Sequence, residues 1–287
     1  MKVIKSVFAI VRQNFRKWIG NPRYYILFLF VITNFWHQMD GMLSQAKKIG
    51  SAFNAYSLFP ILYSNSIGMG RLILNAGILF LFCDAPFIDR NQQFVITRSG
   101  KKIFGFAQIV YIILGAAVYT FVLAIFPCIF TYGYIGIANE WGTLMRTISL
   151  SNYPILGNIA VDSRMLQLFS AKQAFLLEIS MFFLVSVMLG LVVYLFNLLF
   201  YRLTGIIVAG ALMLLGVLPY YFPIKLQWVY WVSPVSFAEI NHLNITGSTG
   251  YPPVWYAFTF LFIAILLLGG AIMLAIEKTK LIVREEI

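Results

Sequence analysis

Residues 254–276 read VWYAFTFLFIAILLLGGAIMLAI, an apolar run without a single charged side chain. A helix rises about 1.5 Å per residue, so this run would form a helix about 34 Å long. The hydrocarbon core of a bilayer is about 30 Å thick, and a run of this length is sufficient to cross it. The run predicts a transmembrane helix and decides the fold class.

The composition of the whole chain agrees with a membrane protein. Of its 287 residues, 61% are hydrophobic and 11% are charged, whereas soluble domains carry about 25% charged residues. A soluble protein of this size has too little interior to bury so much apolar side chain. We therefore expect an all-α membrane protein with one domain over residues 1–287.

Five more apolar runs precede the one at 254–276 and predict a total of six transmembrane helices. A proline, Pro219, is expected to end the fifth, which is short. The five runs cover residues 24–42, 67–87, 104–130, 175–199 and 203–218.

The amino-terminal segment, residues 1–20, is too charged to cross a membrane. Its apolar residues recur at steps of three and four, and Lys and Arg occupy the remaining arc, which predicts an amphipathic helix. One interpretation is an interfacial helix whose cations contact anionic lipid. The alternative is a surface helix packed on its own protein. Asn21-Pro22 is expected to end the helix and turn the chain into the bilayer.

The distribution of basic residues predicts the orientation. Most of the 21 Lys and Arg residues fall in segments that share one side of the membrane with the amino terminus. Because Lys and Arg are enriched in cytoplasmic loops, both termini are expected in the cytoplasm. The net charge of +11 lies at the ends of apolar runs and forms no continuous basic stripe, which favours membrane lipid over nucleic acid as a partner.

Two connections are too apolar to be plain loops. Residues 88–103, between the second and third spans, can form a short cytoplasmic helix that docks on a partner protein, or a membrane-surface helix without a partner. Residues 219–250, before the last span, combine prolines with aromatic residues and predict a re-entrant or interfacial hairpin on the outer side. The candidate docking residues in and beside the first segment are Phe87, Ile88, Phe94, Val95, Arg98 and Lys101.

Two charged residues, Arg71 and Glu178, fall near the outer ends of their predicted spans. Charges inside a membrane are costly and mark a pathway or a buried pair. We expect Arg71 and Glu178 to pair with each other. The alternative is that each side chain extends separately to the interface.

The order of these features resembles the membrane-spanning permease of type-2 ABC exporters. The residues that carry the resemblance are Asn21-Pro22-Arg23, Thr97-Arg98-Ser99-Gly100-Lys101, Leu218-Pro219 and Ser233-Pro234-Val235. The resemblance implies an elbow helix, a coupling segment, and a second permease copy or homologue. It also implies export across a bacterial plasma membrane, driven by separate cytoplasmic ATPase subunits. The long segment 132–174 departs from the short outer loop common in that family and is interpreted as an elaboration for a particular substrate.

The chain lacks motifs for chemistry of its own. It contains no G-x-x-x-x-G-K-[ST] phosphate loop, no H-E-x-x-H and no G-x-S-x-G, so ATP hydrolysis is expected on a separate chain and no cofactor or metal is expected here. Aromatic, weakly charged spans suit an amphipathic peptide-, drug- or lipid-like substrate. The alternatives are a channel or membrane scaffold without ATP coupling, and an intramembrane enzyme.

Overall fold

The computed structural model describes residues 2–64, 69–87, 92–150, 155–156, 159–201, 203–221, 227–244 and 250–278. This part of the chain is almost entirely helical, which confirms the all-α class. The four strands in this part of the chain are two residues long and form two separate pairs. One pair joins β1 (Phe53–Asn54) to β2 (Ile135–Gly136) in parallel, and the other joins β3 (Ile155–Leu156) to β4 (Ile159–Ala160) antiparallel.

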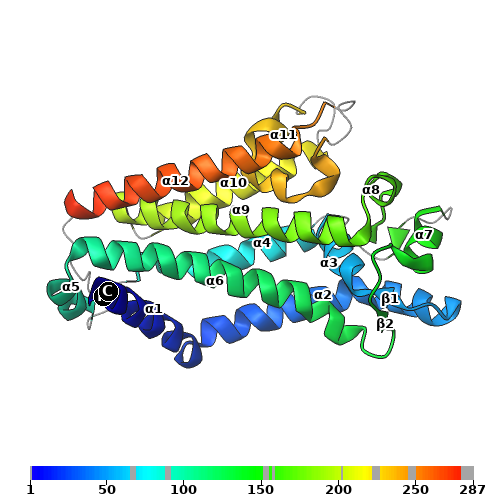
Figure 1. Cartoon of the computed structure of the whole chain (residues 1–287), viewed down its shortest axis with the longest axis horizontal. Helices are drawn as coiled ribbons and strands as arrows, with labels where there is room; N and C mark the ends of the chain where they lie inside the picture. The colour runs from blue at the N-terminus through cyan, green and yellow to red at the C-terminus, as the bar shows by residue number, and fades with distance from the viewer. Residues whose placement is uncertain are drawn as a thin grey trace.

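Three of the described helices are long and apolar enough to cross a membrane: α6 (Lys101–Phe130), α9 (Ala171–Leu199) and α12 (Val254–Lys278). They contain the third, fourth and sixth predicted spans. Two shorter apolar helices are α4 (Met69–Phe82) and α10 (Thr204–Tyr221). Together with α2 (Pro22–Ile49), these helices lie side by side along the long axis of the molecule (Figure 1).

Helix α9 forms the centre of the bundle, in contact with α4, α6, α10 and α12. Nearly every side chain from Met181 to Leu195 is buried, so the helix is apolar on almost all sides there. The buried Ser186 hydroxyl donates to the Phe182 carbonyl of the same helix at 2.7 Å. At Gly190 the neighbours come so close that an added Cβ would lie 2.6 Å from Ile112 Cγ2. Helix α12 lies at the periphery, and only Ala257, Leu261, Ile272 and Ile276 among its side chains are buried.

The helix boundaries correct three of the predicted spans. Helix α2 continues beyond the predicted residue 42 and ends at Gly50, whose φ of 67° closes the helix in the left-handed region. The second predicted span is helical only over α4, within the described residues, and a separate buried helix, α3 (Ala55–Ser64), precedes it. Pro219 does not end α10, because the fixed φ of proline also fits the last turn of a helix.

The amino-terminal segment forms helix α1 (Lys2–Gly20), as predicted. The predicted break is confirmed: the Asn21 side chain accepts a hydrogen bond from Arg23 N at 3.0 Å, and Pro22 opens α2. One face of α1 packs on α6, where Asn14 Nδ2 donates to Gln108 Oε1 at 2.6 Å. Its other face exposes both apolar and basic side chains, namely Ile4, Phe8 and Ile19 beside Lys5, Arg12 and Arg16.

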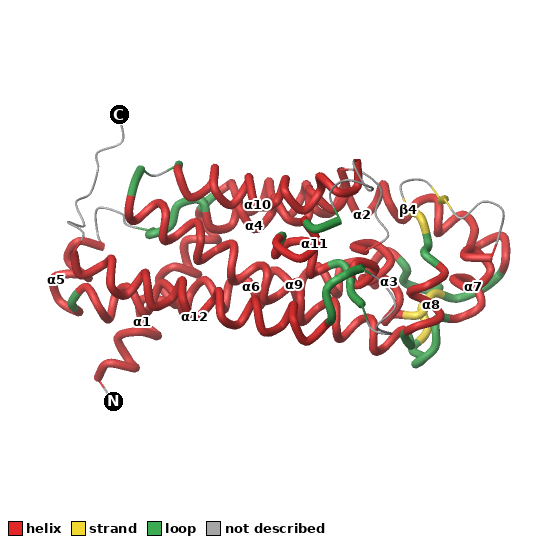
Figure 2. The backbone as a smooth tube through the Cα atoms, turned by 90° about the horizontal axis from the view of Figure 1, so that it is seen from above, coloured by secondary structure: helices red, strands yellow, loops and turns green. Residues whose placement is uncertain are grey.

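The two ends of the bundle differ in what they carry. Helix α5 (Gln92–Ser99), the start of α1 and the end of α12 share one end, and α7 (Gly142–Leu150) and α8 (Ser163–Leu168) lie at the other (Figures 1 and 2). The segment between α6 and α9 is a small folded unit. Its Trp141 is buried and donates from Nε1 to the Phe169 carbonyl at 2.6 Å.

Candidate functional site

A buried ion pair joins helix α4 to the segment before α12. Arg71, near the start of α4, pairs with Glu239, which lies in extended backbone between two short 3-10 helices, η1 (Pro234–Ala238) and η2 (Ile240–His242). The two side chains are 6% and 2% exposed. Two charges this deep in protein are tolerated only when they compensate each other.

A second set of contacts brings Glu178 of α9 to the same place. The Ser64 hydroxyl, at the end of α3, donates to the Glu178 carboxylate and accepts a hydrogen bond from Ile240 N at 3.1 Å. Asn241 Nδ2 donates to the Ser64 carbonyl at 3.1 Å. The end of α3 therefore holds η2 against α9.

Further polar groups complete what we call the ionic cluster: Arg71, Glu239, Glu178, Ser64 and His242. The His242 Nδ1 lies 2.8 Å from Glu239 Oε2, and its ring lies 4.3 Å from the ring of Tyr230. Burial alone would raise the pKa of the Glu239 carboxyl, but the Arg71 charge and His242 hold that pKa below its ordinary value. Glu239 is therefore ionised at neutral pH.

The cluster connects elements rather than presenting reactive groups. Within the described residues, no three His, Cys, Asp or Glu side chains gather where they would hold a metal ion. The cluster contacts α3, α4, α9 and η2 at one depth in the bundle. Its chemistry suits a fixed electrostatic joint that ties the segment 227–244 to the helices.

The predicted pair of Arg71 and Glu178 is wrong, because the ion partner of Arg71 is Glu239. Both residues nevertheless lie in one cluster, and both are buried, at 5% and 0% exposure, so neither extends to the surface. The position of a charged residue within a predicted span indicates that the charge needs a partner, but it does not say which segment supplies that partner. The signal that was missed is that Glu239 is the acidic residue of the segment 219–250.

The candidate docking residues separate into exposed and buried groups. Phe94 is 78% exposed, and Arg98 on the same helix, α5, is also exposed. Val95 is half-buried against the core. Phe87 is buried, with its ring 4.9 Å from the ring of Tyr111, so its expected role as a surface contact is wrong. Ile88 lies outside the described residues.

The sixth candidate, Lys101, contacts the end of α12. Its Nζ donates to the Glu277 carbonyl of α12 at 3.4 Å, and the neighbouring Lys102 Nζ lies 2.5 Å from the Glu277 carboxylate. These contacts join the start of α6, directly after α5, to the end of α12. A force on α5 would therefore reach both helices.

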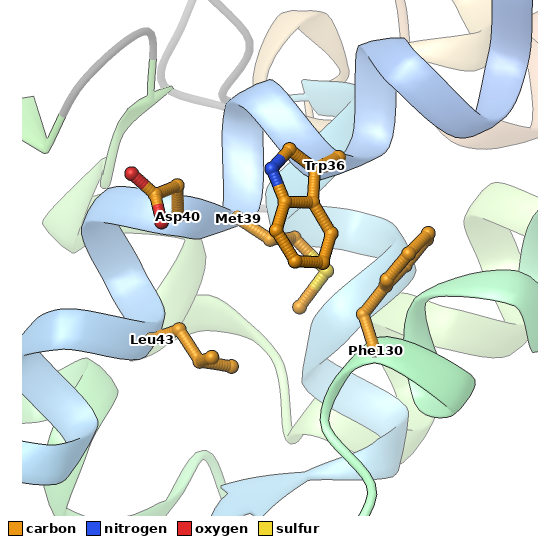
Figure 3. Close-up of a pocket in the computed structure, with 5 residues that line it drawn as sticks. All are labelled: Trp36, Met39, Asp40, Leu43 and Phe130. Atoms are coloured by element: carbon orange, nitrogen blue, oxygen red, sulfur yellow. The ribbon is translucent and has the colours of Figure 1, made fainter.

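Two hollows differ greatly in size. The smaller lies between α2 and the end of α6, where Trp36 and Phe130 meet edge to face at 5.7 Å (Figure 3). Its volume of about 20 Å³ suits a single water molecule and no substrate. The larger, which we call the α6–α9 groove, has about 460 Å³ and is lined by Ala117, Thr120, Phe121, Ala124, Ile125, Phe175, Ile179, Ser180 and Phe183.

The chain matches no protein-family model, no curated protein and no solved structure. Its function is therefore argued from the pattern of its sequence and the geometry above.

Proposed function

We propose that the chain is the membrane-spanning subunit of an ATP-driven exporter and that a separate cytoplasmic ATPase docks on α5. The observation that carries this proposal is Phe94, a large apolar side chain that is 78% exposed on a short helix at the end of the bundle. Single exposed apolar side chains are common on protein surfaces, whereas larger apolar patches rimmed by polar residues mark interaction sites. Phe94 supports docking through its place on the segment that the resemblance to type-2 ABC exporters assigns to coupling. Gln93, Thr97 and Arg98 are the exposed polar residues around it.

The proposed topology has six crossings with both termini in the cytoplasm of a plasma membrane. Helices α2, α6, α9, α10 and α12 each supply one crossing, and α3 with α4 supplies another. The distribution of charge supports this orientation, because cytoplasmic ends are rich in Lys and Arg. The end with α5 carries Lys5, Arg12, Arg16, Lys17, Arg98, Lys101, Lys102 and Lys278, and the opposite end carries Lys47, Lys48, Arg146, Arg164 and Lys172.

The segment 219–250 is proposed as a re-entrant element on the outer side. Its residues 227–244 fold into α11 (Val229–Val232), η1 and η2, and η1 packs on α9 and α10. Backbone at membrane depth must be covered by protein, and residues 233–240 are all buried. A second permease copy is expected to complete the path, with the exposed apolar side chains of α12 facing lipid or that copy.

Cysteine labelling tests the orientation. In a background with Cys83 and Cys128 replaced by Ala, Thr97→Cys should resist a membrane-impermeant thiol reagent in intact cells, and Thr147→Cys should react. Both threonines are exposed, so a difference in labelling reports the side of the membrane and not burial. Both positions should react after the cells are opened. Labelling of position 97 from outside would contradict the orientation and the docking role of α5 together.

Co-purification tests the function itself. The chain, isolated in mild detergent from its native membrane, should bring with it an ATPase in a fixed ratio, and ATP should then drive export in vesicles. A channel would conduct without ATP, a scaffold would move nothing, and an intramembrane enzyme would turn over a substrate without the ATPase. Conduction or turnover by a preparation that contains no ATPase would exclude the exporter, and so would the absence of any ATPase from a folded chain isolated from its native membrane.

A further inference from the structure

The α6–α9 groove has the size and lining of a binding site for hydrocarbon. Its volume of about 460 Å³ falls in the range of about 300–1,000 Å³ that small-molecule sites occupy. None of its lining side chains is charged. Phe121 and Ile125, on its rim, are 65% and 41% exposed, so the groove opens on the surface of the chain.

The groove lies in the outer half of the membrane in the proposed topology. Thr120 is eighteen residues after Lys102, which corresponds to about 27 Å along the axis of α6. Because the hydrocarbon core is about 30 Å thick, Thr120 lies just inside its outer boundary. On α9 the lining begins at Phe175, shortly after the helix starts at Ala171. The lining from Ala117 to Ile125 on α6 therefore straddles the depth at which the ester or amide group of a lipid-like molecule meets its hydrocarbon chain.

Thr120 supplies a polar group that the fold itself does not use. The side chain is 3% exposed, and its hydroxyl has no hydrogen-bond partner in the described part of the chain. Hydroxyls within helices normally bond to a carbonyl of the preceding turn. Those of Thr97, Ser180 and Ser186 do so at 2.7–2.9 Å. A buried hydroxyl without a partner costs stability unless a ligand satisfies it.

We propose that the α6–α9 groove binds the hydrocarbon chain of an amphipathic, acylated substrate, with the Thr120 hydroxyl donating to the ester or amide carbonyl beside that chain. The absence of charge in the lining keeps a charged headgroup outside, at the membrane surface. The assignment of this ligand as the exported substrate rests on the proposed function. Binding in the groove does not require ATP.

The test uses the full chain in vesicles and a phosphatidylethanolamine that carries a diazirine in one acyl chain. After photolysis, the groove residues should be labelled more strongly than the exposed face of α6 at Leu114 and Val118, which lies outside the groove. Ala124→Trp fills the groove and should abolish its labelling. Val118→Trp places the same indole side chain at an exposed position of the same helix and should leave the labelling unchanged.

Thr120→Val keeps the size of the side chain and removes the hydroxyl, which covers the case in which Ala124→Trp does not fold. The loss of one hydrogen bond should weaken competition by the unlabelled lipid about threefold to tenfold. Equal labelling of both faces, unaffected by either groove variant, would show surrounding bilayer lipid only and would overturn the site. Selective labelling of the groove in a chain that co-purifies with no ATPase would contradict the exporter function but support the binding site.

Discussion

Replacing Glu239 with Gln should destabilise the protein by about 3–5 kcal/mol, because the change leaves the buried Arg71 guanidinium without its counter-charge. The pair is 6% and 2% exposed, so water cannot compensate for the loss. The measurement is the free energy of unfolding in a denaturing-detergent titration. The control is Glu140→Gln, which breaks the exposed pair of Glu140 and Arg146 and should cost at most about 1 kcal/mol.

A double-mutant cycle isolates the pair from the rest of the ionic cluster. Arg71→Met and Glu239→Gln should each be costly, and the double variant should be more stable than the two separate losses predict. The exchange of Arg71→Glu with Glu239→Arg should restore part of the stability, whereas the exchange of Arg71→Glu with Glu178→Arg should not. A coupling energy near zero between positions 71 and 239 would disprove the joint.

The same pair predicts how stability depends on pH. Since the pKa of Glu239 is held below its ordinary value, the folded protein binds this proton less tightly than the unfolded chain does. The stabilisation is therefore complete above the ordinary pKa of a Glu carboxyl and is lost as the pH falls through the lowered value. Glu239→Gln should remove this part of the acid sensitivity.

Replacing Phe94 with Asp should abolish transport while the protein still inserts and folds. Phe94 is 78% exposed, so it contributes little to packing within the chain. If it enters a pocket of the ATPase, burial of such a side chain contributes about 1.5–3 kcal/mol, and its loss weakens docking about tenfold to a hundredfold. The measurements are transport in vesicles and ATPase retention on the purified chain.

The matched control for this variant is Gln93→Asp, which adds the same charge to the neighbouring exposed position of α5. Gln93 is already polar and offers no apolar contact, so transport should persist. Thermal unfolding of both variants should resemble that of the wild type. Normal transport by Phe94→Asp at equal expression would show that no partner covers this side chain.

Much of the fold was predictable because the strongest signals are local. The charge-free run at 254–276 and the break at Asn21-Pro22 appear in the structure as predicted. Helix α3 was missed because ten residues are too few to cross a bilayer, and an apolar run of that length has no periodic contrast. Its all-round burial comes from packing against α6 and α9, which depends on residues far away in the sequence.

The candidate site was predictable only in part for the same reason. An intramembrane Arg and an intramembrane Glu indicate that compensation is needed, but the partner of Arg71 comes from a segment without regular helix pattern. Phe87 and Phe94 look alike in sequence, since both are apolar residues between charges. Phe87 is buried because it packs against Tyr111 of α6, whereas Phe94 is exposed.

The ion pair of Arg71 and Glu239 also affects the order in which the parts of the protein can assemble during synthesis. Its two residues lie 168 positions apart in the sequence. A ribosome adds about 5–20 residues per second, so about 8–34 s pass between the synthesis of Arg71 and that of Glu239. During that interval the nascent chain carries an uncompensated cation into or beside the bilayer. The part of the bundle around this pair can therefore close only after Glu239 has been synthesised, when 48 of the 287 residues (287 − 239) remain to be added.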